Sequence, residues 1–389
     1  MYSLTSLLQL PHHKQSELTW LYISSVLRTF VAGFAFSLLP IVLYETNSQD
    51  TIKDTLIFVA SLYLITHTVR LFVNPLIFNI CSTFGLKWGL TLGQVSLTIV
   101  CILLKNNALI PAFITLGFAI GFWWDAYHLY FGTKVKDSSI GKNLGTLGAL
   151  SLMTGMLTPL ISGLVLTIES YDTYWNISIL LSLVSIVPTF FLTGNKPLSH
   201  VSFTDIYRES KNHTRDFFMF FGLSAESVTS RIIWPLALAF ILDDYLSLGI
   251  FFTLVSLGAI IIYLLLGRYI DSHPKKTMER IGVGAVTTSW FGKVFVQNPI
   301  GFYIFEMIHS LGHPLFDMPA NAIGYEHAHR ETASIYIAFR QTAIQIAEIA
   351  TLLIFILVIS IDAPISVMFI LAAFVATLPL IHSKYPVHS

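Results

Sequence analysis

Residues 335–361 read IYIAFRQTAIQIAEIATLLIFILVISI, a run in which Arg340 and Glu348 are the only charged residues. A helix that crosses the hydrocarbon core of a bilayer needs about 20 mostly apolar residues. A charge at the centre of the bilayer costs about 2.5 to 3.5 kcal/mol, so it is normally paired or faces water. The run therefore predicts a membrane-spanning helix with one polar side.

The whole chain has the composition that this run predicts. It has 389 residues, of which 54% are hydrophobic and 11% charged, with a mean hydropathy of +0.71. Soluble domains carry about 25% charged residues. Lys plus Arg and Asp plus Glu number 22 each, which argues against nucleic acid as a partner. Cys81 and Cys101 lie in separate apolar stretches and predict neither a disulfide framework nor a metal-binding pair.

Twelve apolar runs separated by polar, Gly or Pro residues are long enough to cross a membrane. They cover residues 18–44, 55–80, 86–104, 108–131, 144–168, 174–192, 217–242, 246–266, 281–296, 300–322, 335–361 and 365–381. The first run lacks a small-residue cleavage site, so we expect a retained helix and not a cleaved signal.

The charges outside these runs predict the orientation of the chain. With the amino terminus in the cytoplasm, fifteen Lys and Arg residues fall on the cytoplasmic side and three on the other. Because Lys and Arg in short loops favour the cytoplasmic side, we expect a multi-pass protein of the plasma membrane with both termini in the cytoplasm.

The long polar stretch at 194–216 follows the sixth run and divides the chain into two predicted halves. Features recur 189 to 195 residues apart, namely Pro40 with Pro235, Gly85 with Pro274, and Tyr130 with Tyr325. The predicted fold is an all-α integral membrane protein of twelve helices, in two six-helix bundles related by a pseudo-two-fold repeat. The predicted domains are a cytoplasmic segment 1–17, a bundle 18–193, a cytoplasmic linker 194–216, a second bundle 217–381 and a cytoplasmic tail 382–389.

Two short patterns resemble signatures of the major facilitator superfamily. The basic loop from Gly267 contains Asp271, Pro274, Lys275 and Lys276, and resembles the gating motif G-x-x-x-D-x-x-G-[RK]-[RK] with proline at its second glycine. The counterpart in the first half, residues 78–87, keeps Gly85 and Lys87 and has Ser82 in place of the acid. Gly155, Pro159 and Gly163 in the fifth run resemble the helix-5 motif that is common in exporters of this superfamily.

The resemblance implies a secondary transporter that works by alternating access. It also implies that helices 1, 4, 7 and 10 line a central cavity, whereas helices 3, 6, 9 and 12 are peripheral. The ionisable residues within the runs follow this division, because helices 3, 6 and 12 carry none in their interiors and helix 9 carries only Lys293, near its outer end. The candidate substrate and proton-coupling residues are Arg28, Asp125, His128, Glu226, Arg231, Glu306, His309, His313, Asp317, Arg340 and Glu348. His67 and Arg70 on helix 2 also lie within the membrane.

Helix 10 carries the densest group. Glu306, His309, His313 and Asp317 fall within an arc of about 80° on an ideal helix and predict one polar stripe. The stripe suits proton relay, because imidazole titrates near neutrality. It suits equally a divalent metal bound by the two histidines, or structural pairing with neighbouring helices.

The remaining charges leave their partners open. Arg340 is a candidate to neutralise Asp317, whereas Arg28 and Arg70 need anions such as Glu226, Glu348 or an anionic substrate. The cluster WWDAYHLY at 123–130 suits an interfacial aromatic belt, or an aromatic wall for a cationic or aromatic substrate.

These observations predict a proton-coupled secondary transporter of a small solute, with a weak lean to export. We expect a monomer, no enzymatic activity, no cofactor and no resident metal. The motif G-x-x-x-x-G-K-[ST] is absent, which argues against ATP drive by this chain. The alternative functions are an intramembrane metal-dependent enzyme that uses the helix-10 stripe, and a receptor or scaffold that retains the fold without transport.

Overall fold

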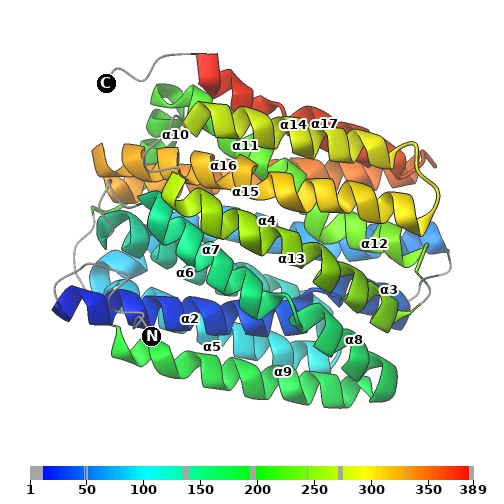
Figure 1. Cartoon of the computed structure of the whole chain (residues 1–389). Helices are drawn as coiled ribbons and strands as arrows, with labels where there is room; N and C mark the ends of the chain where they lie inside the picture. The colour runs from blue at the N-terminus through cyan, green and yellow to red at the C-terminus, as the bar shows by residue number, and fades with distance from the viewer. Residues whose placement is uncertain are drawn as a thin grey trace.

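The computed structural model describes residues 12–47, 49, 51–134, 140–192, 199–242, 244–269, 275–330 and 332–384. All the regular elements in these residues are helical (Figure 1). The helices run roughly parallel and antiparallel in one bundle. We call the end at which α2 begins and η4 ends the terminal end, and the other end the opposite end.

Six spans make up the first half. They are α2 (His12–Phe36) with α3 (Leu39–Thr46), α4 (Ile52–Phe84), α5 (Leu86–Lys105), α6 (Leu109–Lys134), α7 (Ile140–Gly155) with α8 (Thr158–Ile168), and α9 (Tyr171–Ile186) with η2 (Val187–Phe191).

A short helix, α10 (Phe203–Asn212), precedes the second half. The six spans that follow are α11 (Thr214–Val228) with η3 (Thr229–Ile233) and α12 (Trp234–Ala239), α13 (Tyr245–Tyr269), α14 (Lys275–Lys293), α15 (Pro299–Arg330), α16 (Ala333–Ser360), and α17 (Ser366–Val375) with η4 (Leu378–Lys384). The described elements therefore confirm the twelve predicted spans.

Seven helical stretches in the described residues are long and apolar enough to cross a membrane by themselves. Six of them are the spans of the first half, and the seventh is α16. Parts of α13 and of the α17–η4 span qualify as shorter apolar helices. Among the helices of the second half, α13 is itself a 25-residue apolar helix, whereas α15 carries Glu306, His309, His313 and Asp317 along its length.

The first span of each half is broken at the same place. Residues 37–38 separate α2 from α3, and Pro40 lies in the first turn of α3. In the second half the π-helical turn η3 precedes α12, which carries Pro235 in its first turn. Proline lacks an N–H and breaks the regular ladder of helical hydrogen bonds. This correspondence is the structural form of the predicted repeat.

Several helices extend beyond their apolar runs. The ninth span, predicted at 281–296, is α14 at Lys275–Lys293, and α15 continues to Arg330 although its apolar run ends at 322. Helix hydrogen bonds do not need an apolar side chain at every position, so polar helix ends can continue past the hydrocarbon boundary.

The helix α10 lies in the segment predicted as the linker and is amphipathic. Ser202 and Asp205 form a capping box at its start, and the hydrogen bonds from Ser202 lower the pKa of Asp205. Ile206 is buried, and α10 packs against α16. The capping box fixes where this helix begins, and the apolar contact docks it on the second half.

The two halves meet along two pairs of crossing helices. On one side α4 packs against α16, and on the other α13 packs against α7 and α8. Gly249 of α13 lies so close to α8 that a Cβ atom there would lie 2.5 Å from the Pro159 carbonyl oxygen. A Cβ atom at Gly163 would likewise clash with the Tyr245 carbonyl oxygen. Glycine at these positions permits backbone contact between the halves.

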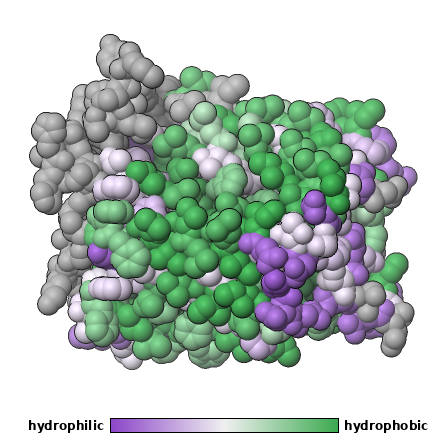
Figure 2. All heavy atoms as spheres, turned by 90° about the horizontal axis from the view of Figure 1, so that it is seen from below, coloured by the Kyte–Doolittle hydropathy of each residue, from purple (hydrophilic) through white to green (hydrophobic). Residues whose placement is uncertain are grey.

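The face seen in Figure 2 is apolar over a broad band, with polar residues gathered mostly toward the opposite end. The band includes exposed side chains of α9 such as Leu180, Leu183 and Val184. A contiguous apolar surface of this extent suits contact with lipid chains.

The Gly249 contact generates a stability prediction. We expect Gly249→Ala to lower the thermal unfolding temperature of the detergent-solubilised protein, because overpacking against backbone costs about 1 to 3 kcal/mol. The matched control is Gly284→Ala in α14, where a Cβ atom meets nothing within 4 Å. Equal melting temperatures of the two variants would contradict the close contact.

Candidate functional site

A cavity of about 740 Å³ lies between the two halves. Its wall combines residues of α2, α3, α4, α5, α6, α7 and α8 with residues of η3, α12, α13 and α15. Aromatic side chains form much of the lining, namely Phe36, Tyr63, Trp123, Trp124, Tyr127, Phe252, Tyr263 and Tyr325. Arg28, Arg231, His67 and His128 also line the cavity, and Asp317 is the one carboxylate of the described residues that does so.

Arg28 of α2 is a buried cation held by neutral groups. Its guanidinium donates to Gln94 Oε1 at 2.8 Å and to the Ala119 carbonyl oxygen at 3.2 Å, and it lies 4.8 Å from the centre of the Trp123 ring. None of the carboxylates in the described residues forms an ion pair with it. Its charge is therefore available to an anion in the cavity.

Glu348 of α16 is shared by one residue from each half. His67 Nδ1 of α4 lies 2.7 Å from Glu348 Oε2, and Arg231 Nη2 of η3 lies 2.8 Å from Glu348 Oε1. The side chain of Glu348 is 3% exposed, whereas that of Arg231 is 61% exposed and borders the cavity. The carboxylate thus joins α4 to the π-helical turn at the cavity wall.

Further polar contacts continue this seam toward the terminal end. Arg70 donates to Gln341 Oε1 at 2.7 Å, and Asn74 donates to the Ala338 carbonyl oxygen at 2.9 Å. Asp125 of α6 lies 3.7 Å from Arg70 and is buried away from the cavity wall. Arg70 therefore receives a protein anion, whereas Arg28 does not.

The aromatic cluster of α6 faces the cavity. Trp124, Tyr127 and His128 are in its lining, and the Trp124 and His128 rings stack at 5.4 Å. His128 Nδ1 lies 2.5 Å from the Tyr325 hydroxyl of α15, so this cluster also contacts the second half. These rings of the cluster therefore form part of the cavity lining.

The helix-10 stripe divides between two environments. Asp317 lines the cavity, whereas Glu306 and His309 are buried inside the second half. His309 Nε2 lies 2.7 Å from Glu226 Oε1, and His313 Nε2 lies 3.8 Å from Glu226 Oε2. The Trp290 indole donates to the same Glu226 carboxylate at 2.8 Å.

Lys293 completes this buried network. Its ammonium is paired with Glu306, and it lies 3.9 Å from the centre of the Trp290 ring and 4.2 Å from that of Trp234. The Lys293 side chain is 0% exposed, although the sequence places it near the outer end of its helix. The pair supplies Glu306 with a partner inside its own half.

Arg340 does not pair with Asp317 in the structure. Its guanidinium donates to Asn321 Oδ1 at 2.5 Å and lies 5.2 Å from the centre of the Phe220 ring. Neutral and aromatic groups hold this cation, as they hold Arg28.

The two halves also contact each other at the opposite end. Lys53 of α4 pairs with Asp362 at 3.0 Å, and Tyr245 of α13 donates to Glu45 Oε2 at 2.6 Å. Because the His128–Tyr325 contact lies toward the terminal end, the cavity has cross-half contacts on both sides.

The residues of the gating motif contact helix ends within their own half, whereas the helix-5 motif contacts the other half. Gly85 joins α4 to α5 at a φ of 100°, a conformation that favours glycine, and Lys87 donates to the Phe190 carbonyl oxygen at 2.6 Å. In the second half Lys275 pairs with Glu326. Lys276 lies in the first turn of α14, Gly267 lies in α13, and Asp271 lies outside the described residues. In the helix-5 motif, Pro159 and Gly163 contact α13, and Gly155 lies beside Thr29.

Sequence reasoning left some contributors out of the candidate set. His67 and Arg70 lie within predicted helix 2, but their spacing gives no indication that α16 supplies their partners. Lys293 and Trp290 lie outside the set because helix 9 is expected to be peripheral. The signal that could have found Lys293 is its position on an otherwise uncharged apolar segment, which implies a buried acid nearby.

The fold is shared with a solved structure of the human organic anion transporter MFSD10 (TETRAN). The TM-score is 0.75, with 95% of this chain and 99% of that chain covered, at 11% sequence identity. At this identity the likeness shows the fold alone. No protein-family model matches the chain, and no curated protein matches its sequence.

The buried Lys293–Glu306 pair generates a prediction about stability. We expect Glu306→Leu to destabilise the protein by about 3 to 5 kcal/mol, because it leaves a buried ammonium without its anion. The double variant Glu306→Leu/Lys293→Met removes both charges and should recover most of the loss in thermal unfolding. If the double variant melts no higher than the single one, the pair does not stabilise the bundle.

Proposed function

We propose that this chain, which has the major facilitator fold expected from its sequence, is a secondary transporter of a small organic anion. The observation that carries the proposal is the cavity between the halves, with Arg28 and Arg231 in its wall and Asp317 as its only described carboxylate. A site at the interface of two repeated bundles is where alternating access requires the solute to bind.

The charges of the wall support an anionic solute. Arg28 has no carboxylate partner, and Arg231 presents a largely exposed guanidinium beside the cavity. Guanidinium groups bind carboxylates and related anions through charge-assisted hydrogen bonds. The aromatic lining adds apolar surface, so the solute class is an anion with an apolar or aromatic part. The human transporter with this fold is an organic anion transporter, which agrees with that class.

The shared carboxylate supports proton coupling. A solute anion that binds Arg231 competes with Glu348 for the same guanidinium. A carboxylate that loses a cationic partner takes up a proton more readily. His67 lies 2.7 Å from Glu348, so a proton can reside on either group while the seam between α4 and α16 opens. We therefore assign the coupling to His67 and Glu348.

We propose export as the direction, on the resemblance of Gly155, Pro159 and Gly163 to the exporter motif. The positive-inside count supports a cytoplasmic position for the terminal end, in a protein that we propose for the plasma membrane. A monomer suffices for this mechanism, because one chain supplies both halves of the cavity wall.

The pairing of Glu306 with Lys293 and of Glu226 with His309 disfavours the enzyme alternative. These residues are buried within the second half and do not border the cavity. A hydrolytic metal site needs an open coordination position that substrate can reach.

The anion assignment predicts the behaviour of an arginine variant. In proteoliposomes tested with pools of labelled organic anions and cations, only anions should be transported. We expect Arg28→Gln to raise the KM for a transported anion at least about tenfold, because a hydrogen bond to a charged group contributes about 1.5 to 3 kcal/mol.

Lys105→Gln is the matched control, since Lys105 is a cation of the same half that pairs with Asp172 at the opposite end. Transport of cations, or an unchanged KM in Arg28→Gln, would refute the proposed substrate class.

The coupling assignment predicts a separation of two activities. With a pH-sensitive dye inside the vesicles, we expect Glu348→Gln to abolish solute-dependent proton movement and to retain solute exchange. We expect His67→Gln to weaken proton movement in the same way. His309→Gln serves as the comparison from the buried network. If His309→Gln uncouples transport and Glu348→Gln does not, the coupling site lies on the helix-10 stripe.

A further inference from the structure

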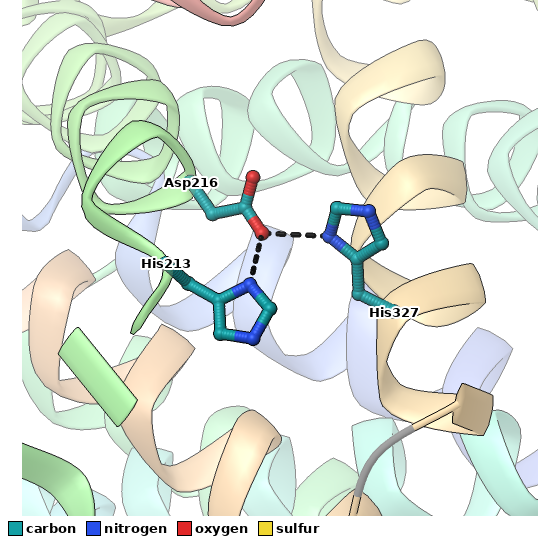
Figure 3. Close-up of side chains that lie close together, drawn as sticks. All are labelled: His213, Asp216 and His327. Carbon is teal, nitrogen blue, oxygen red and sulfur yellow. Dashed lines mark hydrogen bonds and ion pairs between the residues drawn. The ribbon is translucent and has the colours of Figure 1, made fainter. Parts of the chain in front are cut away.

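Two histidines and an aspartate gather at the terminal end, outside the cavity (Figure 3). His213 joins α10 to α11, Asp216 lies in the first turn of α11, and His327 lies in the last turn of α15. Their ligand atoms all lie within 4.8 Å of one another, and they are the one such group of three in the described residues. The transport proposal does not use these residues.

Both imidazoles point at the same carboxylate oxygen. His327 Nδ1 lies 2.7 Å and His213 Nδ1 3.4 Å from Asp216 Oδ2. The Asp216 side chain is 3% exposed, whereas the two histidines are about one-fifth exposed at 20% and 22%. The carboxylate is therefore fixed within the protein while solvent can reach the imidazoles.

These distances are close to those of a zinc site. Zn²⁺ binds His nitrogen at about 2.0 to 2.1 Å and carboxylate oxygen at about 2.0 to 2.2 Å, so tetrahedral ligand atoms lie about 3.3 Å apart. The His213–Asp216 distance already matches this value, and the His327–Asp216 distance would have to lengthen by about 0.6 Å. A shift of the His327 imidazole, which is 22% exposed, would supply that change.

A second carboxylate lies behind one of the histidines. Glu209 Oε1 lies 3.5 Å from His213 Nε2, the ring nitrogen that does not face Asp216. Metal-binding histidines commonly donate the other ring N–H to a carboxylate, which fixes the tautomer and strengthens the ligand. Glu209 is placed to act as this positioning residue, and it reaches the group from α10.

We propose that His213, Asp216 and His327 form a binding site for a divalent transition metal, with Zn²⁺ as the best fit. Two imidazoles and one carboxylate are a ligand set that Zn²⁺ uses when a fourth position is left to water. The bound metal would tie the start of α11 to the end of α15. Binding does not depend on the proposed transport function, so the two can fail separately.

The metal-free group also has a role as a hydrogen-bonded cluster. The Tyr336 hydroxyl donates to Asp216 Oδ2 at 2.7 Å. Burial raises the pKa of Asp216, but the hydrogen bonds from His213, His327 and Tyr336 outweigh burial and hold the pKa below its usual range. An experiment must therefore separate metal binding from the loss of these hydrogen bonds.

The test is a titration of the purified full chain in detergent with Zn²⁺, using a competing chromophoric chelator, and with Co²⁺ followed by its visible absorption. We expect one Zn²⁺ per chain and a Co²⁺ spectrum typical of tetrahedral coordination. His327→Ala should weaken Zn²⁺ binding at least about 100-fold, and Glu209→Gln about tenfold, since losses in the outer shell alone cost 10- to 100-fold. His327→Cys should restore binding, because thiolate is also a zinc ligand.

The matched control is His200→Ala, a histidine of the same polar segment that contacts Asn79 and not this group. The affinity of His200→Ala for Zn²⁺ should equal that of the unmodified chain. Thermal unfolding without metal shows whether each variant folds. If His327→Ala does not fold, His327→Cys still tests the site. The absence of stoichiometric binding, equal loss in His200→Ala, or failure of His327→Cys to bind when folded would overturn the proposal.

Discussion

A buried carboxylate costs free energy in a bilayer unless it is paired, and Glu348 is paired with residues of both halves. A carboxylate in a medium of low dielectric constant needs a compensating partner close by, and Glu348 has the Arg231 guanidinium of the second half and the His67 imidazole of the first. The same contact fixes the crossing of α4 with α16 and orients a guanidinium toward the cavity. The electrostatic requirement thus sets the packing of the halves and the chemistry of the wall together.

The other buried charges fall into two groups according to their partners. Lys293 with Glu306, and His309 with Glu226, are satisfied inside the second half and hold its helices together. Arg28 is held by amide and carbonyl oxygens and an aromatic ring, so its charge is not cancelled by the protein. The charges of the first group stabilise the bundle, whereas Arg28 can bind a ligand. Burial alone does not distinguish the two groups.

Apolar length alone predicted the twelve spans, because every crossing must satisfy its backbone within the helix. The surroundings of the charges could not be predicted in the same way. The helix-10 stripe lies on one side of an ideal helix, yet Glu306 faces Lys293 whereas Asp317 faces the cavity, since α15 passes different neighbours along its length. Asp125 belongs to the aromatic cluster in sequence but lies behind the wall with Arg70. The surroundings of such a residue depend on partners from distant helices, and the local spacing of residues does not reveal those partners.

The two crossings between the halves differ in how they can move. The α4–α16 crossing is tied by directional bonds such as Asn74 to the Ala338 carbonyl, which must break before the helices separate. The crossing of α13 with α8 combines the backbone contact at Gly249 with a hydrogen bond from Thr253 to the Met156 carbonyl oxygen at 2.8 Å, so fewer directional bonds oppose a small displacement there. In the alternating-access cycle that we propose for this chain, we expect the first crossing to contribute most of the activation enthalpy and the second to act as the pivot. The temperature dependence of turnover would then report on one side of the molecule only.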